Sequence, residues 1–268
     1  MSHLTVTAGD LDADAGTDAL EGSWAGLVSH VRAHGSQLVV LPEMPFAPWL
    51  AASTDVDPDR WDEAVAVHEG WLGRLHELDA DTVVTTMPVV DEGRRHNEAI
   101  VWTATHGIVA RRRKTFLPDE AGFREASWYE RGPVHFPVVP TPAVELGVMV
   151  CTELWFPEYA RALGRDGARL LAVPRATPAA SVSRWEAGAR TVASIAGAFV
   201  ISVNRAGAAA GDDGRGPRFD GGSTIVDPEG DVLARTTPTT PSATATLDLD
   251  LAEVARSTYP RYVDDGIG

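Results

Sequence analysis

Short runs of aliphatic and β-branched residues alternate with longer helical patterns along the chain, and this alternation is the feature that most restricts its fold. The runs LTVTA at 4–8, QLVVL at 37–41 and TVVTTM at 82–87 each predict a strand. Between the first two, apolar residues from Leu20 to Val31 recur at the spacing of one helix face, and the pattern ends near Gly35. Strand and helix patterns in this order favour an α/β layered fold.

The same two patterns continue to the end of the chain. Residues 61–75 carry a second helical stripe, and strands at 98–103 and 108–113 flank His106-Gly107 as a predicted hairpin. The segment 115–141 is expected to be a long structured loop, and 207–217 a flexible surface loop. The other expected elements are strands at 146–150, 168–173 and 199–204, helices starting near Pro157 and Ser183, a hairpin turning at 227–230 and a last strand at 243–250.

Length and composition limit the classes of partner. The 268 residues are expected to form one domain, residues 1–268, around a large core. A net charge of -15 argues against a nucleic acid or an anionic membrane as partner, because binding phosphates needs clustered positive charge. No apolar run approaches the ~20 residues of a membrane helix, and the first residues lack the pattern of a secretion signal. Together with a single cysteine, these features predict a cytoplasmic protein that acts on a small molecule.

Three polar residues each follow a predicted strand. Glu43 comes after QLVVLP, Lys114 after IVARRR, and Cys151 after LGVMV. Ligands of open α/β sheets bind outside the carboxyl ends of the strands, so a carboxylate, an ammonium and a thiol are expected to meet at one edge.

These three groups together suit covalent catalysis. A thiol with an ordinary pKa is mostly protonated at neutral pH and needs a base, which Glu43 provides. Attack on a carbonyl or nitrile carbon places negative charge on oxygen or nitrogen, and the compact ammonium of Lys114 stabilises that charge. Lys114 is the only lysine among 23 basic residues, and a planar guanidinium would need more room. Taken singly, a solvated lysine, a core cysteine and a helix-start glutamate are the ordinary interpretations; their occurrence together favours the functional one.

Three ordered blocks of sequence resemble the carbon-nitrogen hydrolase (nitrilase) superfamily. They are VVLPEM around Glu43, RRRKTFLPDEAGFREASWYERG around Lys114, and GVMVCTELWFPEYAR around Cys151. Weaker similarities add Asn97, before the predicted hairpin, and the segments GARLLAVPRA, VNRAG and FDGGSTIVDPEG. The resemblance implies a four-layer αββα sandwich, usually a homodimer, in which Glu43 is the general base, Lys114 stabilises the tetrahedral intermediate and Cys151 is the nucleophile.

The resemblance also implies a second glutamate in the loop after the lysine. The segment GFRE offers Glu125 for this role, as in relatives that hydrolyse N-carbamoyl compounds, and Glu120 is the alternative. Its implied function is to hold the lysine and to orient substrate or water.

Two positions depart from the pattern of many family members. Thr152-Glu153 follows the cysteine where an aromatic residue and an acid are usual, and Arg175 stands where a small or polar residue is usual. Arg175 is a candidate to pair with a substrate carboxylate, and the alternative is a surface or interface arginine. Thr152, Trp155 and Phe123 are further candidates for substrate contact. The aromatic residues that could line or roof the pocket are Trp49, Phe123, Trp128, Trp155 and Trp185.

The expected activity is hydrolysis of an amide or N-carbamoyl small molecule through a thioester on Cys151, with release of ammonia or an amine. The alternatives are a nitrilase that forms the acid from a nitrile, a binding protein that keeps the fold without turnover, and a redox-sensing thiol protein. No metal and no organic cofactor are expected. The chain has no HExxH motif, no second cysteine, and no GxSxG, Walker A or GxGxxG segment.

Overall fold

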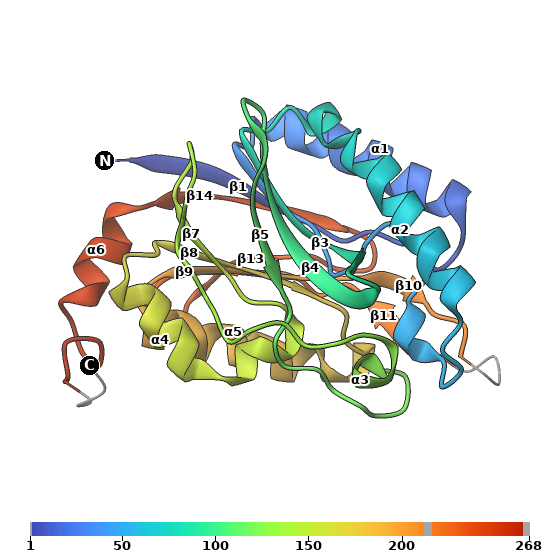
Figure 1. Ribbon diagram of the computed structural model, residues 1–268. Coiled ribbons are helices and arrows are strands. Elements are labelled where there is room, and N and C mark those ends of the chain that lie inside the picture. Colours follow the sequence, from blue (N-terminus) through green and yellow to red (C-terminus); the bar gives the residue numbers. More distant parts are fainter. Residues whose placement is uncertain (1, 212–215, 265–268) are drawn as a thin grey trace.

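Two six-stranded sheets face each other in the computed structural model, which describes residues 2–211 and 216–264. Helices α1 (Thr17–His34) and α2 (Pro58–Leu72) cover the outer face of one sheet. Helices α4 (Pro157–Arg165) and α5 (Val182–Ala196) cover the outer face of the other, as Figure 1 shows. The four-layer αββα sandwich implied by the sequence resemblance is therefore confirmed.

The first sheet has the strand order β14-β1-β2-β3-β4-β5. Strands β1, β2 and β3 run parallel, β4 is antiparallel to β3, and β5 is antiparallel to β4. Strands β2 and β5 therefore end at the same edge of this sheet. Its strands are β1 (His3–Gly9), β2 (Leu38–Val40), β3 (Thr82–Asp91), β4 (Arg94–Thr103), β5 (Gly107–Arg113) and β14 (Ser242–Asp248).

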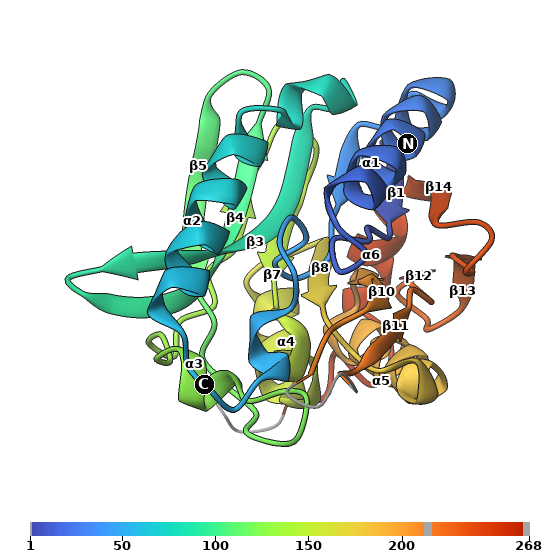
Figure 2. The same ribbon diagram turned by 90° about the vertical axis from the view of Figure 1, so that its right-hand side faces the viewer.

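The second sheet has the order β13-β12-β9-β8-β7-β6, and its three central strands β7, β8 and β9 are parallel. Their buried, nearly continuous apolar sequences are typical of parallel strands covered on both faces. The strands are β6 (Val139–Pro140), β7 (Glu145–Val148), β8 (Leu170–Arg175), β9 (Phe199–Asn204), β12 (Thr224–Val226) and β13 (Val232–Arg235). Figure 2 shows the two sheets from the side.

Strand β2 shows how the alternation of side chains builds the layers. Val39 belongs to the apolar cluster under α1 and α2, whereas Leu38 and Val40 belong to the cluster shared with the second sheet. Successive side chains of a strand point to opposite faces, so one short apolar run supplies both cores. On the other side of the molecule, Gly164 of α4 lies so close to the carbonyl of Ala196 that a Cβ would be 2.0 Å from its oxygen. This close packing holds α4 against α5.

The helix boundaries follow local signals. Helix α1 ends at Gly35, whose φ of 59° is in the left-handed region that glycine adopts readily. Helix α2 begins after Asp57, whose carboxylate accepts hydrogen bonds from the N–H groups of Asp59 and Arg60. The 3-10 helices are η1 (Leu50–Ala52), η2 (Leu75–Leu78), η3 (Cys151–Trp155) and η4 (Ala179–Ser181).

Four sequence expectations need correction or extension. The predicted loop at 115–141 contains the single-turn helix α3 (Glu125–Trp128), and a helix not predicted, α6 (Asp250–Arg256), follows β14. The predicted loop at 207–217 begins in a two-stranded sheet formed by β10 (Ala206–Ala208) and β11 (Arg218–Asp220); its residues 212–215 lie outside the described part. Asn97 lies within β4 and not before the hairpin, because that strand starts three residues earlier. None of the described helices is long and apolar enough to cross a membrane.

Candidate active site

The three residues predicted to act together come from two different sheets. Glu43 lies three residues after β2, and Lys114 follows β5 directly, so both extend from one edge of the first sheet. Cys151 lies three residues after β7 of the second sheet. The expectation of a single sheet edge is therefore wrong in this detail. The two sheets meet where the N–H of Glu43 donates to the carbonyl of Arg175, at 3.4 Å.

Glu43, Lys114 and Glu125 form one buried ion cluster. The Nζ of Lys114 donates to Oε1 of Glu43 at 2.8 Å and to Oε2 of Glu125 at 2.5 Å. None of these three side chains has any exposed surface. Glu120, the alternative second glutamate, is exposed. The geometry thus favours Glu125 as the second carboxylate beside the lysine.

Three further residues hold the two carboxylates in place. The Nδ2 of Asn97 donates to Oε1 of Glu43 at 2.6 Å, and the N–H of Ala176 donates to Oε2 at 3.1 Å. The hydroxyl of Tyr129 donates to Oε2 of Glu125. Tyr129 is four residues after Glu125, a spacing that places both on one helix face and could have been recognised in the sequence. Ala176 makes its contact through its backbone N–H, so no feature of the sequence indicates it.

Two buried oxygens of the cluster have no hydrogen-bond partner among the described residues. They are Oε1 of Glu125 and Oδ1 of Asn97. A buried polar atom without a partner is costly, so native proteins keep few of them. Glu125 also lines the cavity described below. Its free oxygen is therefore a candidate hydrogen-bond acceptor for a ligand in that cavity.

Cys151 adopts an unusual backbone conformation for a residue with a Cβ, with a φ of 47°. This conformation forms a sharp turn between the strand and η3, and its Sγ lies 3.7 Å from the carbonyl oxygen of Ala176. Ala176 thus contacts both the thiol, through its carbonyl, and Glu43, through its N–H. The backbone of one residue links the candidate nucleophile to its candidate base.

Burial and neighbouring charges determine how these groups titrate. Burial raises the pKa of Cys151 above its ordinary value, the charge of Glu43 adds to this, and Lys114 opposes it. The thiol is therefore protonated at neutral pH and needs a base when it attacks. Burial acts to lower the pKa of Lys114, but the charges of Glu125 and Glu43 together hold that pKa above its ordinary value. The lysine therefore remains an ammonium.

The pKa of Glu125 is higher than that of an ordinary glutamate. Burial raises its pKa to about 7, the charge of Lys114 opposes this rise, and the charge of Glu43 adds to it. Two carboxylates share one ammonium, so the second carboxylate ionises with difficulty. A perturbed carboxyl group of this kind is common at catalytic sites.

Glu153, the acid two residues after Cys151, holds the turns around the cluster. Its Oε1 accepts from the N–H of Thr115 at 2.6 Å, and its Oε2 accepts from the N–H of Val150 at 2.6 Å. The guanidinium of Arg112 donates to both oxygens. Thr115 and Val150 are the direct neighbours of Lys114 and Cys151, so this buried carboxylate fixes the segments that carry them. The sequence did not indicate this structural role for Glu153.

A cavity of about 490 Å³ opens at Cys151 and Glu125. Thr152, Trp155 and Phe123, all expected to contact substrate, line it, and so does the exposed Glu120. The rest of its lining consists of Pro118, Asp119, Ala176, Thr177, Pro178, Ser181, Arg184 and Trp185. Cys151, the candidate nucleophile, therefore faces an accessible, mainly apolar space of a size suited to a small molecule.

Arg175 is not among the described residues that line this cavity. Its guanidinium is buried and donates to Oγ of Ser202 at 2.9 Å, to the carbonyl of Gly222 at 2.8 Å and to the hydroxyl of Thr177. Burial lowers its pKa to about 10. These contacts occupy the guanidinium with the protein itself, so the geometry gives no support to the predicted pairing with a substrate carboxylate. That contact stays a prediction.

Two of the five aromatic candidates belong to the core and not to this cavity. The indoles of Trp49 and Trp128 donate to the carbonyls of Gly122 and Ser53, at 3.0 and 2.8 Å.

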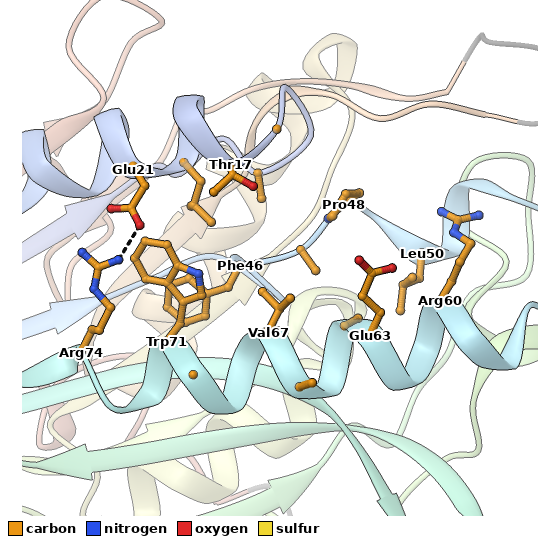
Figure 3. A pocket seen from close by; sticks show the side chains of 17 residues that line it. Thr17, Glu21, Phe46, Pro48, Leu50, Arg60, Glu63, Val67, Trp71 and Arg74 are labelled. Carbon is orange, nitrogen blue, oxygen red and sulfur yellow. Dashed lines mark hydrogen bonds and ion pairs between the residues drawn. The ribbon is translucent and has the colours of Figure 1, made fainter.

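A second cavity, also of about 490 Å³, lies between α1 and α2 and is bounded by Phe46, Val67, Trp71 and the Glu21–Arg74 ion pair (Figure 3). Its lining does not include Glu43, Lys114 or Cys151, so it is a separate space.

Within residues 2–211 and 216–264, no group of three or more histidine, cysteine, aspartate or glutamate side chains is arranged to hold a metal ion. His68 illustrates this. It is buried, its Nδ1 lies 2.7 Å from the carbonyl of Ala64, and burial lowers its pKa to about 4. Its environment is that of a packed core histidine.

Comparison with known proteins assigns the family. The model of the carbon-nitrogen hydrolase family matches residues 15–259. The chain therefore belongs to the carbon-nitrogen hydrolase family. It is also similar in structure to a carbon-nitrogen hydrolase from Helicobacter pylori G27, with a TM-score of 0.84, 24% identity, and coverage of 97% of this chain and 94% of the other. At this identity the structural similarity shows the fold.

Several curated relatives differ in the chemistry that their names describe. A glutamine-dependent NAD(+) synthetase from Rhodobacter capsulatus is 31% identical over 240 residues, which cover 88% of this chain. The chain spans only 40% of the length of that synthetase. A citrullinase from Francisella tularensis is 26% identical over 212 residues, covering 75% of this chain and 73% of the relative.

Proposed function

We propose that this protein hydrolyses a non-peptide C–N bond, that of an amide or N-carbamoyl group, in a small molecule. The observation that carries the proposal is the buried Lys114 ammonium bound by two carboxylates beside a cavity that Cys151 lines. The family match to residues 15–259 supports the same chemistry. Names of relatives such as citrullinase and (R)-stereoselective amidase agree with it.

The reaction begins when the thiol proton of Cys151 passes to Glu43 and the sulfur attacks the carbonyl carbon. The C–O double bond opens, and the oxygen carries negative charge that the ammonium of Lys114 stabilises. Glu43 then gives its proton to the nitrogen as the C–N bond breaks, so ammonia or an amine leaves and a thioester remains.

Water completes the cycle. Glu43 takes a proton from the water as its oxygen attacks the thioester, and the C–S bond then breaks. The sulfur leaves as a thiolate and regains the proton held by Glu43. For a primary amide the sum is amide plus water giving carboxylic acid plus ammonia. Glu125 holds Lys114 and accepts a hydrogen bond from the substrate N–H through its free oxygen.

A screen of ammonia release tests this function. Primary amides, N-carbamoyl amino acids and nitriles are incubated with the wild-type protein and with Cys151→Ala, and intact mass is recorded in parallel. We expect release with amides or N-carbamoyl compounds, together with an acyl adduct on the wild type only. Acid formed from nitriles alone would favour a nitrilase, and oxidation of the thiol without any adduct would favour redox sensing.

The family resemblance also leads us to expect a homodimer, and the single cysteine agrees with a reducing compartment such as the cytoplasm. Five exposed large apolar side chains lie within residues 251–263, and we propose them as candidates for the contact between two copies. They are Leu251, Val254, Tyr259, Tyr262 and Val263. Light scattering after size exclusion, on the wild type and on Tyr262→Glu, tests the dimer, and cell fractionation tests the location.

A further inference from the structure

The catalytic cavity changes in character from its buried end to its mouth. Cys151 and Glu125 at the buried end are 3% and 0% exposed. Phe123 and Trp185 are nearly buried apolar walls, at 8% and 9%, whereas Trp155 is 42% exposed. The rings of Trp155 and Trp185 meet edge to face with centroids 5.2 Å apart. A substrate whose amide lies at Cys151 therefore passes an apolar section before it reaches solvent.

Two charged side chains at the mouth have no partner among the described residues. Glu120 and Arg184 line the cavity, both are exposed, and neither has an ion pair or side-chain hydrogen bond within residues 2–211 and 216–264. Asp119, also in the lining, differs because it accepts from Ser127 at 3.3 Å and lies 3.8 Å from Arg124. One free anion and one free cation thus remain.

Both free charges stand on ordered backbone. Glu120 and Phe123 exchange two backbone hydrogen bonds, of 3.2 and 2.8 Å, and the turn between them is tied to Trp49 through the carbonyl of Gly122. Arg184 lies in the first turn of α5, where the helix dipole disfavours a cation and helix stability gives no reason for it. A fixed turn and a helix hold the two charges at the mouth before any ligand arrives, which reduces the entropy lost on binding.

From this arrangement we propose that the substrate is an ω-amide or ω-ureide that carries an α-amino acid head group. Its carboxylate binds Arg184, its ammonium binds Glu120, and a short methylene chain lies between Phe123, Trp155 and Trp185. This inference rests on the proposed function, because it assumes that the reacting carbon lies at Cys151. It names the substrate class for that same site.

The chemistry of the head group explains why both charges matter. A guanidinium binds a carboxylate with two parallel hydrogen bonds, and a carboxylate accepts from an ammonium. An uncharged amide of equal length leaves both protein charges as they are in water, so it gains only from the apolar walls. A substrate with a single charge gains one ionic contact. The cavity therefore ranks substrates by the number of charges in the head group.

Four amides with the same reacting group test this ranking. They are L-glutamine with both charges, glutaramate with only the carboxylate, γ-aminobutyramide with only the ammonium, and butyramide with neither. L-citrulline is measured beside L-glutamine to compare a ureide with an amide. We expect kcat/KM to fall about tenfold for each charge removed, since a charge-assisted contact is worth about that factor.

Two variants assign the contacts. Arg184→Gln is expected to reduce the preference for L-glutamine over γ-aminobutyramide about tenfold, and Glu120→Gln the preference for L-glutamine over glutaramate by a similar factor. Arg32→Gln, at an exposed position on the outer helix α1, changes the charge as Arg184→Gln does; it is the control and should preserve both ratios. Ratios between substrates are used because they are independent of the amount of correctly folded enzyme.

The outcomes separate this inference from the function on which it rests. Hydrolysis of butyramide as fast as that of L-glutamine and L-citrulline, or unchanged ratios in both variants, overturns the head-group inference and leaves the C–N hydrolase intact. Absence of turnover and of any adduct on Cys151 with every amide and ureide overturns both. The proposal is supported if kcat/KM falls with each charge removed from the substrate, if Arg184→Gln loses the preference for the carboxylate, and if Glu120→Gln loses the preference for the ammonium.

Discussion

Two buried glutamates near Cys151, Glu153 and Glu125, have opposite environments. Both oxygens of Glu153 accept strong hydrogen bonds, from two backbone N–H groups and from Arg112. Glu125 receives Lys114 and Tyr129 on one oxygen only, and its other oxygen has no partner among the described residues. Burial raises the pKa of Glu125 to about 7.

The difference separates a structural carboxylate from one prepared for a ligand. A buried charge whose hydrogen bonds are all made stabilises the geometry around it. A buried carboxylate with a free oxygen beside a cavity instead carries an unfavourable energy that a bound substrate can relieve. Replacement of Glu153 and replacement of Glu125 should therefore affect different properties of the protein, and the predictions below test this difference.

The largest effect is expected for Cys151→Ala, which removes the proposed nucleophile beside the Glu125 cluster. Turnover should fall by about 10³-fold or more, as for the loss of other catalytic nucleophiles. Cooperative unfolding should persist, because alanine fits the same buried position. Ammonia release and thermal unfolding measure the two properties. Substantial activity in this variant would remove the covalent mechanism altogether.

Lys114→Arg comes next. The ammonium lies in a fully buried space between two carboxylates, and a guanidinium is wider and spreads its charge over a planar group. We expect kcat to fall about 100-fold, which corresponds to the loss of one well-placed stabilising charge. Steady-state kinetics measures the change, with Arg32→Lys on α1 as the matched control. Full activity would rule out the steric explanation for the only lysine in the chain.

Glu153→Gln should act on stability. The substitution leaves Arg112, whose side chain is 8% exposed, without its charged partner. We expect the free energy of unfolding to fall by about 3–5 kcal/mol. Denaturant unfolding measures it, and Glu69→Gln at an exposed position of α2 should stay within about 0.5 kcal/mol of wild type. Equal losses for Glu153→Gln and Glu125→Gln would contradict the distinction between the two carboxylates.

The pH dependence of stability should identify Glu125. Its pKa rises from 4.5 to about 7 on folding, so the native state binds the proton more tightly than the unfolded state. The stability gained from that proton is complete below pH 4.5 and is lost as pH rises through about 7. Over this window the wild type should lose roughly 1–3 kcal/mol relative to Glu125→Gln. Parallel curves for both proteins would contradict the raised pKa.

Local patterns determined most elements of the fold in advance. The apolar run QLVVL became the buried strand β2 (Leu38–Val40), and the helical stripe from Leu20 became α1 with its end at Gly35. Elements without such a pattern were missed. The strands β10 and β11 have three residues each, of which Phe219 is the only large apolar one, and they pair with each other. Helix α3 is a single turn within a loop. Neither is stable from local sequence alone.

Only part of the candidate site was predictable from the sequence. Glu43, Lys114 and Cys151 stood out by residue type and by following strands, and Glu125 by family resemblance. The supporting contacts of Ala176 and Glu153 did not, because one is made by backbone atoms and the other by a carboxylate that could equally have faced solvent. Arg175 was expected to reach the substrate, but its guanidinium is occupied by Ser202, Thr177 and Gly222.

The sequence by itself determined the layers and the chemical groups, because side-chain periodicity and residue type are local properties. Only the tertiary structure decided which groups meet. Lys114 and Glu43 are 71 positions apart, and Ala176 and Glu43 are 133 apart. Such distant contacts depend on how two sheets pack face to face, and that packing also removes water from the cluster. Burial then raised the pKa of Cys151 and Glu125, a change that no segment of the chain produces alone.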